Sequence, residues 1–132
     1  MAPKDRIYKK EYAKELLRVG HNDLVAAKAL SQHDEVRGET VLLMVQQAIE
    51  KGLKSVLCHL GKSVPMTHDL YGIVQRLGSN YEPPFAEQIE ELTPYATIRR
   101  YEEGRFEITG QDMANAIVIA EAIIKWCEER VK

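Results

Sequence analysis

Two groups of charged residues in the sequence have the chemistry to bind an anion. The first joins Lys51 and Lys54 to the polar segment Thr67, His68 and Asp69. Ammonium groups attract phosphate, the free backbone N–H groups of a helix N-terminus point at such an anion, and an imidazole exchanges a proton near neutral pH. The same residues would also fit a solvated helix face followed by an ordinary helix cap. The spacing leaves both interpretations open.

The second group is Arg99, Arg100, Tyr101 and Arg105, which precede the last predicted helix. Guanidinium groups bind phosphate through two parallel hydrogen bonds, and an aromatic ring among them could stack on a base. Glutamates are interleaved with these arginines and offset their charge. A nucleotide or phosphate site and a surface ion-pair network are therefore both compatible with this segment.

Other kinds of site are not indicated. The four histidines and two cysteines do not form any of the spacings typical of metal ligands. The sequence has no GxSxG turn, no GxGxxG loop and no P-loop, so the common nucleophilic and nucleotide-binding motifs are excluded. We therefore predict no catalytic residues from motifs, no metal and no cofactor.

Composition limits the class of protein. The chain has 132 residues, 45% of them hydrophobic and 29% charged, with a formal net charge of −2. This length predicts one globular domain over residues 1–132, and the charge gives no bulk attraction to nucleic acid or membrane. The two cysteines, Cys58 and Cys127, are too few for a disulfide framework. Without a signal segment or a membrane-spanning run, we expect a cytoplasmic protein.

Helical periodicity runs through most of the chain. Apolar residues follow a regular 3-1 spacing from Val41 to Leu60, which predicts a core helix that Gly61 would end. A first helix is expected from about Lys9 to Ser31, with Gly20 and His21 as its weak point. The face of the core helix opposite the stripe is expected to be solvated; it carries Gln47, Glu50, Lys51, Lys54 and Ser55.

Shorter signals complete the architecture. Thr67 could cap a short helix with Asp69 in its first turn, and a further short helix is expected around Phe85 to Leu92. Thr109 and Asp112 form a capping-box-like pair that would open a last helix reaching about Arg130. No alternating β pattern is present. The fold class predicted is all-α, an antiparallel up-and-down bundle of four main helices plus a short extra helix.

The last predicted helix has an apolar arc wider than half its circumference, since Ile119, Ile123 and Trp126 extend the stripe that begins at Met113. Two helices of the same subunit could sandwich this arc. Alternatively, part of it could form a homodimer interface. The sequence alone does not decide between these arrangements.

An ordered set of segments resembles the HEPN domain family, a nucleotide-binding domain of higher eukaryotes and prokaryotes. The set comprises QQAIEKGLKSVL at 46–57, THDL at 67–70, YATIRRYEEG at 95–104, and IT at 108–109 before the last helix. The resemblance covers about residues 12–130. It implies a helical bundle of four or five helices, commonly a homodimer, often encoded beside or fused to a minimal nucleotidyltransferase.

Family members include ribonuclease toxins of toxin–antitoxin pairs, regulatory partners and nucleotide-binding modules. The matching positions in this chain are Lys51, Lys54, His68, Asp69, Arg99, Arg100 and Tyr101. The ribonuclease members carry an Arg followed after four to six residues by a His, near the start of the last helix. Here the expected His position falls near Gly104 to Phe106, and no His follows His68.

The resemblance to the family and the absence of the His expected before the last helix together favour a non-catalytic or weakly catalytic module. Such a module would bind a nucleotide or phosphate and act with a nucleotidyltransferase partner. RNA cleavage by the family mechanism is not expected. Two alternatives stay open: a protein–protein docking module without a ligand, and a ribonuclease toxin in which His68 replaces the missing C-terminal His.

Overall fold

The computed structural model describes residues 6–92 and 107–132, and its regular elements are all helical. Three long helices dominate: α1 (Tyr12–Ser31), α2 (Gly38–His59) and α6 (Gly110–Arg130). Between α2 and α6 lie α3 (Leu70–Leu77), α4 (Ala86–Ile89) and the 3-10 helix η1 (Glu90–Leu92). Within the described residues, the predicted all-α helical bundle is confirmed.

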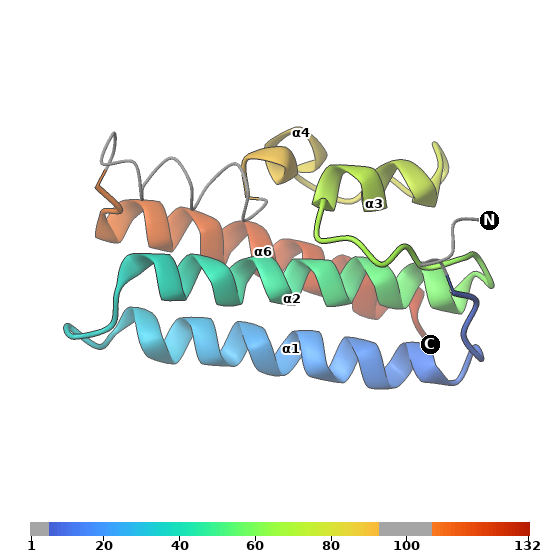
Figure 1. Cartoon of the computed structure of the whole chain (residues 1–132), viewed down its shortest axis with the longest axis horizontal. Helices are drawn as coiled ribbons and strands as arrows, with labels where there is room; N and C mark the ends of the chain where they lie inside the picture. The colour runs from blue at the N-terminus through green and yellow to red at the C-terminus, as the bar shows by residue number, and fades with distance from the viewer. Residues whose placement is uncertain (1–5, 93–106) are drawn as a thin grey trace.

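The long helix α2 lies at the centre of the bundle. It contacts α1, α3 and α6, and α6 also packs on α1 (Figure 1). In that view α1 runs opposite to both α2 and α6, while α3 and α4 lie on the side of the bundle away from α1. The apolar stripe of α2 faces the core as predicted, since Val45, Ile49 and Leu53 have no exposed surface. Burial of α2 on several sides explains its long apolar pattern.

The close approach of α1 to α2 depends on Gly20. A Cβ atom at this position would lie 3.1 Å from the Ala48 carbonyl oxygen and 3.2 Å from the Gly52 nitrogen. The sequence predicted a weak point here, yet α1 runs unbroken through Gly20, which is buried. Because the missing side chain lets the helix backbones meet, packing against α2 compensates for the poor helix propensity of glycine.

Two predicted helix ends are confirmed. Gly61 follows α2 with a φ of 72°, a left-handed conformation that favours glycine, and the Lys62 N–H donates to the Leu57 carbonyl over 3.0 Å. At the start of α6, the Asp112 N–H donates to Thr109 Oγ1 over 3.0 Å and the Thr109 N–H donates back to Asp112 Oδ2 over 2.9 Å. This reciprocal pair is the predicted capping box.

The predicted cap of the short helix is wrong in register. The helix α3 begins at Leu70, so Asp69 is its N-cap residue and Thr67 lies outside it. The Thr67 hydroxyl oxygen instead accepts from the Asp69 N–H over 3.1 Å. The Thr67 side chain therefore closes a local turn and does not cap the helix. Serine and threonine side chains can accept a hydrogen bond from a neighbouring backbone N–H in either arrangement.

The last helix α6 is covered mainly by its own subunit. Ala120, Ile123 and Cys127 have no exposed surface, while Ile119 and Trp126 are half-buried against the core. Val118, by contrast, is 56% exposed. The intramolecular sandwich therefore accounts for most of the apolar arc. Among the described residues, no helix combines the length and hydropathy needed to cross a membrane.

Both cysteines are predicted to be unreactive in the folded protein. Cys58 and Cys127 are free thiols buried in the core. Burial raises the pKa of both thiols, far above the ordinary range for Cys127, and Glu11 raises that of Cys58 further. Because the thiolate is the reactive form, we expect Ellman's reagent to modify neither thiol in buffer and both in urea. Rapid modification of one thiol in the folded protein would contradict this assignment.

Candidate functional site

A buried carboxylate organises the polar residues of α2. Glu50 is only 5% exposed, although the sequence placed it on a solvated face. One of its oxygens, Oε1, accepts from Gln46 Nε2 over 3.0 Å and lies 2.8 Å from His68 Nδ1. The other, Oε2, accepts from Lys54 Nζ over 3.0 Å. A buried charge requires such partners, so the four side chains form one unit, here called the Glu50 cluster: Gln46, Glu50, Lys54 and His68.

The prediction of a solvated face is therefore wrong for part of α2. Glu50 and Ser55 are buried, and the Ser55 hydroxyl donates to the Gly52 carbonyl over 2.6 Å. The segment between α2 and α3 lies over the Glu50 side of α2, since His68 Nδ1 contacts Glu50 and the His68 carbonyl oxygen lies 3.4 Å from Gln46 Nε2. Burial by a neighbouring segment is a tertiary effect, which helical periodicity does not contain.

The two predicted lysines have different partners. Lys54 belongs to the Glu50 cluster and its side chain is 12% exposed. Lys51 instead forms an ion pair with Asp23 of α1, with 2.7 Å between Nζ and Oδ2. Each ammonium group thus has a carboxylate partner within the chain. Neither lysine offers a free positive charge for an anion in this arrangement.

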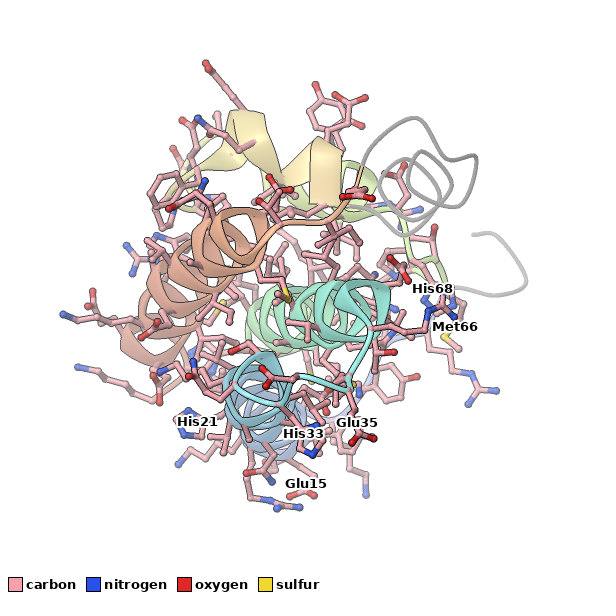
Figure 2. All side chains as sticks on the ribbon, turned by 90° about the vertical axis from the view of Figure 1, so that its left-hand side faces the viewer. Glu15, His21, His33, Glu35, Met66 and His68 are labelled. Atoms are coloured by element: carbon pink, nitrogen blue, oxygen red, sulfur yellow. The ribbon has the colours of Figure 1, made fainter. Side chains whose placement is uncertain are left out.

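His68 is the exposed member of the Glu50 cluster. Its side chain is 74% exposed while its Nδ1 atom is held by Glu50, and Figure 2 shows it beside Met66 on the segment that leads to α3. When Nδ1 carries the proton and donates to the carboxylate, Nε2 is left as an acceptor. The structure thus brings His68 together with Lys54, whereas Asp69 stands at the start of α3 and Lys51 pairs elsewhere.

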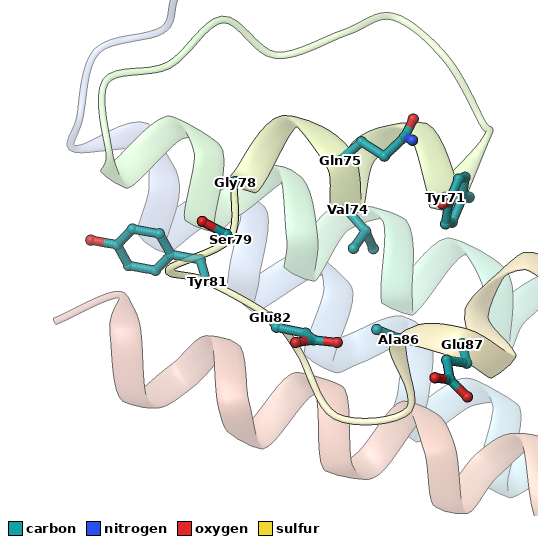
Figure 3. A pocket seen from close by; sticks show the side chains of 9 residues that line it. All are labelled: Tyr71, Val74, Gln75, Gly78, Ser79, Tyr81, Glu82, Ala86 and Glu87. Carbon is teal, nitrogen blue, oxygen red and sulfur yellow. The ribbon is translucent and has the colours of Figure 1, made fainter.

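A separate hollow lies beside α3, and its described lining shares no residue with the Glu50 cluster. Figure 3 shows its lining, which includes Tyr71, Gln75, Tyr81 and Glu82. Of the described residues predicted to bind a ligand, Lys51, Lys54, His68 and Asp69, none lines this hollow. Its described lining brings together carboxylates and tyrosines and supplies no cation of its own. The nearby Lys62 ammonium group lies 5.9 Å from the centroid of the Tyr81 ring and donates to the Leu77 carbonyl oxygen.

The chain as a whole matches a known domain. The family model for the HEPN domain matches residues 13–130. This chain belongs to the HEPN domain family. No curated protein and no solved structure matches it.

The HEPN assignment agrees with the bundle described above, and the match spans α1 through α6. Arg99, Arg100 and Tyr101 fall inside the matched range but outside the residues that the structure describes. Their role in ligand binding stays a prediction, as does their placement relative to the Glu50 cluster. Arg105 lies outside the described residues as well.

Sequence reasoning missed the burial of Glu50, the central residue of the Glu50 cluster. The pattern of α2 places Glu50 on a solvated face, and it gives Gln46 no role. The i, i+4 spacing of Glu50 and Lys54 does predict the ion pair that the structure shows. The same spacing from Gln46 to Glu50 is the signal that could have added Gln46. Across residues 6–92 and 107–132, no group of three His, Cys, Asp or Glu side chains is suited to hold a metal ion.

Proposed function

We propose that this HEPN domain binds the phosphate of a nucleotide and acts with a nucleotidyltransferase partner, without strong catalytic activity of its own. The observation that carries the proposal is the exposed His68 imidazole held on buried Glu50 at 2.8 Å. A polar side chain held in one orientation at the surface loses little entropy on binding a ligand. In its doubly protonated form, the His68 ring keeps Nδ1–H on Glu50 and can donate Nε2–H to a phosphate oxygen.

The positive charge of the proposed site comes from groups other than Lys51 and Lys54. Both lysines are neutralised by carboxylates: Lys54 belongs to the Glu50 cluster, and Lys51 links α2 to Asp23 of α1. We propose that Arg99 and Arg100 supply the charge, with Tyr101 against the base, as the resemblance implies. Asp69, next to His68 at the start of α3, is the remaining residue that we propose to contact the ligand.

Isothermal titration calorimetry tests this assignment. We expect ATP, GTP or their monophosphates to release or absorb heat at millimolar concentration, and the double change Arg99→Ala with Arg100→Ala to remove the signal. The matched control is Arg18→Ala with Lys28→Ala, which removes two exposed cations from α1. Absence of heat with every nucleotide, or equal binding by both double variants, would reject the proposed ligand.

Homodimerisation is the second part of the proposal. Val118 of α6 is 56% exposed and Val25 of α1 is 52% exposed, which leaves apolar surface on the two helices that pack together. We expect a dimer of about twice 15.0 kDa in sedimentation equilibrium at micromolar concentration. The change Val118→Asp is expected to shift the protein toward monomer. A 15.0 kDa species for the unaltered chain would contradict dimerisation.

The partnership with a nucleotidyltransferase has its own test. Co-expression of this chain with a minimal nucleotidyltransferase from a neighbouring reading frame is expected to yield a soluble complex. A docking module without a ligand would give the same complex but no heat in the nucleotide titration. We place both proteins in the cytoplasm, since two free buried cysteines are usual in a reducing compartment.

A ribonuclease activity is the second candidate function, and the Glu50 cluster favours it in one respect. A carboxylate that fixes the tautomer of an exposed imidazole is the arrangement of a general base. His68 would then accept a proton from a ribose hydroxyl. Growth arrest on expression that His68→Ala abolishes would support this function, whereas an absence of both arrest and RNA cleavage would exclude it.

A further inference from the structure

The hollow beside α3 combines aromatic rings, apolar side chains and two carboxylates. Its volume is about 560 Å³, within the usual range of a ligand site. Tyr71 and Val74 come from α3, while Tyr81, Glu82 and Glu87 come from the segment that leads into α4 and from α4 itself. Figure 3 shows the Val74 side chain directed from α3 towards the segment that carries Glu82. The lining is therefore built from two separate stretches of the chain.

Buried neighbours hold this lining in place. Pro83 directly follows Glu82 and is buried, and Ile89, two residues after Glu87, has no exposed surface. On the other side of the hollow, α3 packs on α2, and Ile73 of α3 has no exposed surface. Side chains whose backbone is anchored in this way lose little entropy when a ligand binds.

The two carboxylates of the hollow lack a counter-charge. Glu82 and Glu87 are exposed, and among the described residues neither forms an ion pair or a hydrogen bond. Arg76 of α3 contacts Ser63 instead, with 3.4 Å between Nη1 and Oγ, and Lys62 donates to the last carbonyl group of α3. The local charge of the hollow thus favours a cationic ligand.

The tyrosine rings are a second feature that points to a cation. Lys62 Nζ lies 5.9 Å from the centroid of the Tyr81 ring, within the distance of a cation–π contact. Tyr71 lies towards the other end of the hollow in Figure 3 and is 42% exposed. Among the described residues, no cation lies over the Tyr71 ring. One ring of the hollow thus already faces an ammonium group, while the other has exposed surface and no cation.

We propose that the hollow beside α3 binds an arginine side chain of a partner protein. The planar guanidinium group can bind Glu82 or Glu87 through two parallel hydrogen bonds and stack on the exposed Tyr71 ring. Its methylene stem can lie along Val74. A lysine ammonium group fits less well, because it is compact, strongly hydrated and unable to form the paired hydrogen bonds. The proposal goes beyond the nucleotide site, since it uses none of the residues of the Glu50 cluster.

The open shape of the hollow favours a protein partner over a small free cation. Tyr71, Glu82 and Glu87 all keep exposed surface, whereas sites for small molecules enclose most of their ligand. An arginine that projects from the surface of a partner is covered by that partner on its other side. Arginine is also one of the residues that most often anchor protein interfaces.

Proton–nitrogen NMR of the full chain tests the proposal with a blocked pentapeptide, Gly-Ser-Arg-Ser-Gly. At low salt and millimolar peptide, we expect saturable shifts of the backbone amides of Tyr71, Val74 and Gln75. The same peptide with citrulline in place of arginine keeps the shape without the charge and should give no shifts. A peptide with lysine at the centre should bind more weakly than the arginine peptide.

Paired variants identify the carboxylates that bind. Glu82→Gln with Glu87→Gln is expected to weaken binding of the arginine peptide about tenfold, because it removes both acceptors of the charge-assisted hydrogen bonds. The matched control, Asp34→Asn with Glu35→Gln, removes two exposed carboxylates from the link between α1 and α2 and should leave the affinity unchanged.

The aromatic ring has its own variants. Tyr71→Leu is expected to weaken binding about threefold because it removes the cation–π contact. Tyr71→Phe keeps the ring and should bind the arginine peptide as the unaltered chain does. The same spectra report whether each variant is folded. If Tyr71→Leu unfolds the chain, the variant with Glu82→Gln and Glu87→Gln, which changes two exposed side chains, still decides the question.

Five results would overturn the proposal. They are no shifts with the arginine peptide at millimolar concentration, equal binding of the citrulline peptide, and equal loss in the control carboxylate variant. Saturable shifts with spermidine but not with the arginine peptide would assign the hollow to a free polyamine. Shifts of the same amides on dilution of the protein alone would assign it to a second copy of this chain. The nucleotide titration involves different residues, so each of these results leaves the proposed nucleotide site to its own experiment.

Discussion

Replacement of Glu50 by alanine is expected to lower the free energy of unfolding by about 3–5 kcal/mol. The change removes the acceptor of Lys54 and Gln46 and the partner of His68. Lys54 is 12% exposed, so its ammonium group would stay largely buried without a counter-charge. Urea unfolding followed by circular dichroism measures the loss.

A matched variant at an exposed ion pair shows how much of the stability loss in Glu50→Ala is due to burial of the pair. Glu121→Ala breaks the ion pair with Lys28, in which the two side chains are 46% and 48% exposed, and is expected to cost less than about 1 kcal/mol. Glu50→Gln keeps a polar side chain of the same shape and should fall between the two. Equal stabilities for Glu50→Ala and Glu121→Ala would mean that the Glu50 cluster does not organise this side of the bundle.

Replacement of Gly20 by leucine is expected to have the second large effect, a loss of about 3 kcal/mol, at the upper end of typical overpacking costs. A Cβ here meets backbone atoms of Ala48 and Gly52 at 3.1 and 3.2 Å, and backbone cannot rotate away as a side chain can. The two helices must separate to admit the longer side chain. Thermal and urea unfolding would report the change.

Two further variants, Gly20→Ala and Gly110→Leu, serve as controls for the stability loss expected in Gly20→Leu. In Gly20→Ala, a gain in helix propensity of up to about 1 kcal/mol opposes the tight contact, so we expect a small net change. At Gly110, the first residue of α6, an added Cβ meets nothing within 4 Å. Gly110→Leu is therefore expected to change stability by less than about 0.5 kcal/mol. A Gly20→Leu variant as stable as Gly110→Leu would exclude close packing of α1 on α2.

The helices themselves could be predicted because their signals are local. The apolar stripe of α2 follows the helical period, and the pair Thr109 and Asp112 has the spacing of a capping box. Thr67 has the residue type of a cap as well, but its hydroxyl is used in a turn that ends at Asp69. Residue type alone does not separate these two uses of a threonine.

The candidate site was predicted less well because it depends on tertiary contacts. Lys51 and Lys54 look alike in sequence, yet one pairs with α1 and the other with a buried residue of its own helix. Glu50 is buried because the segment carrying His68 lies over α2, and nothing in the local pattern of α2 specifies that cover. The order of segments that resembles the HEPN family predicted the fold, and the i, i+4 spacing predicted the pair of Glu50 with Lys54. The contacts of Lys51 with Asp23 and of His68 with Glu50 were found only in the structure.

The most direct test of the proposed function follows the His68 imidazole by two-dimensional proton–nitrogen NMR during titration with ATP. Phosphate binding at the Glu50 cluster predicts saturable shifts of the His68 ring nitrogens, with smaller shifts for His21 and His33, which lie on or just after α1. The same titration with Glu50→Gln should show weaker binding. A His68 ring signal that stays unchanged up to millimolar ATP would contradict the proposal.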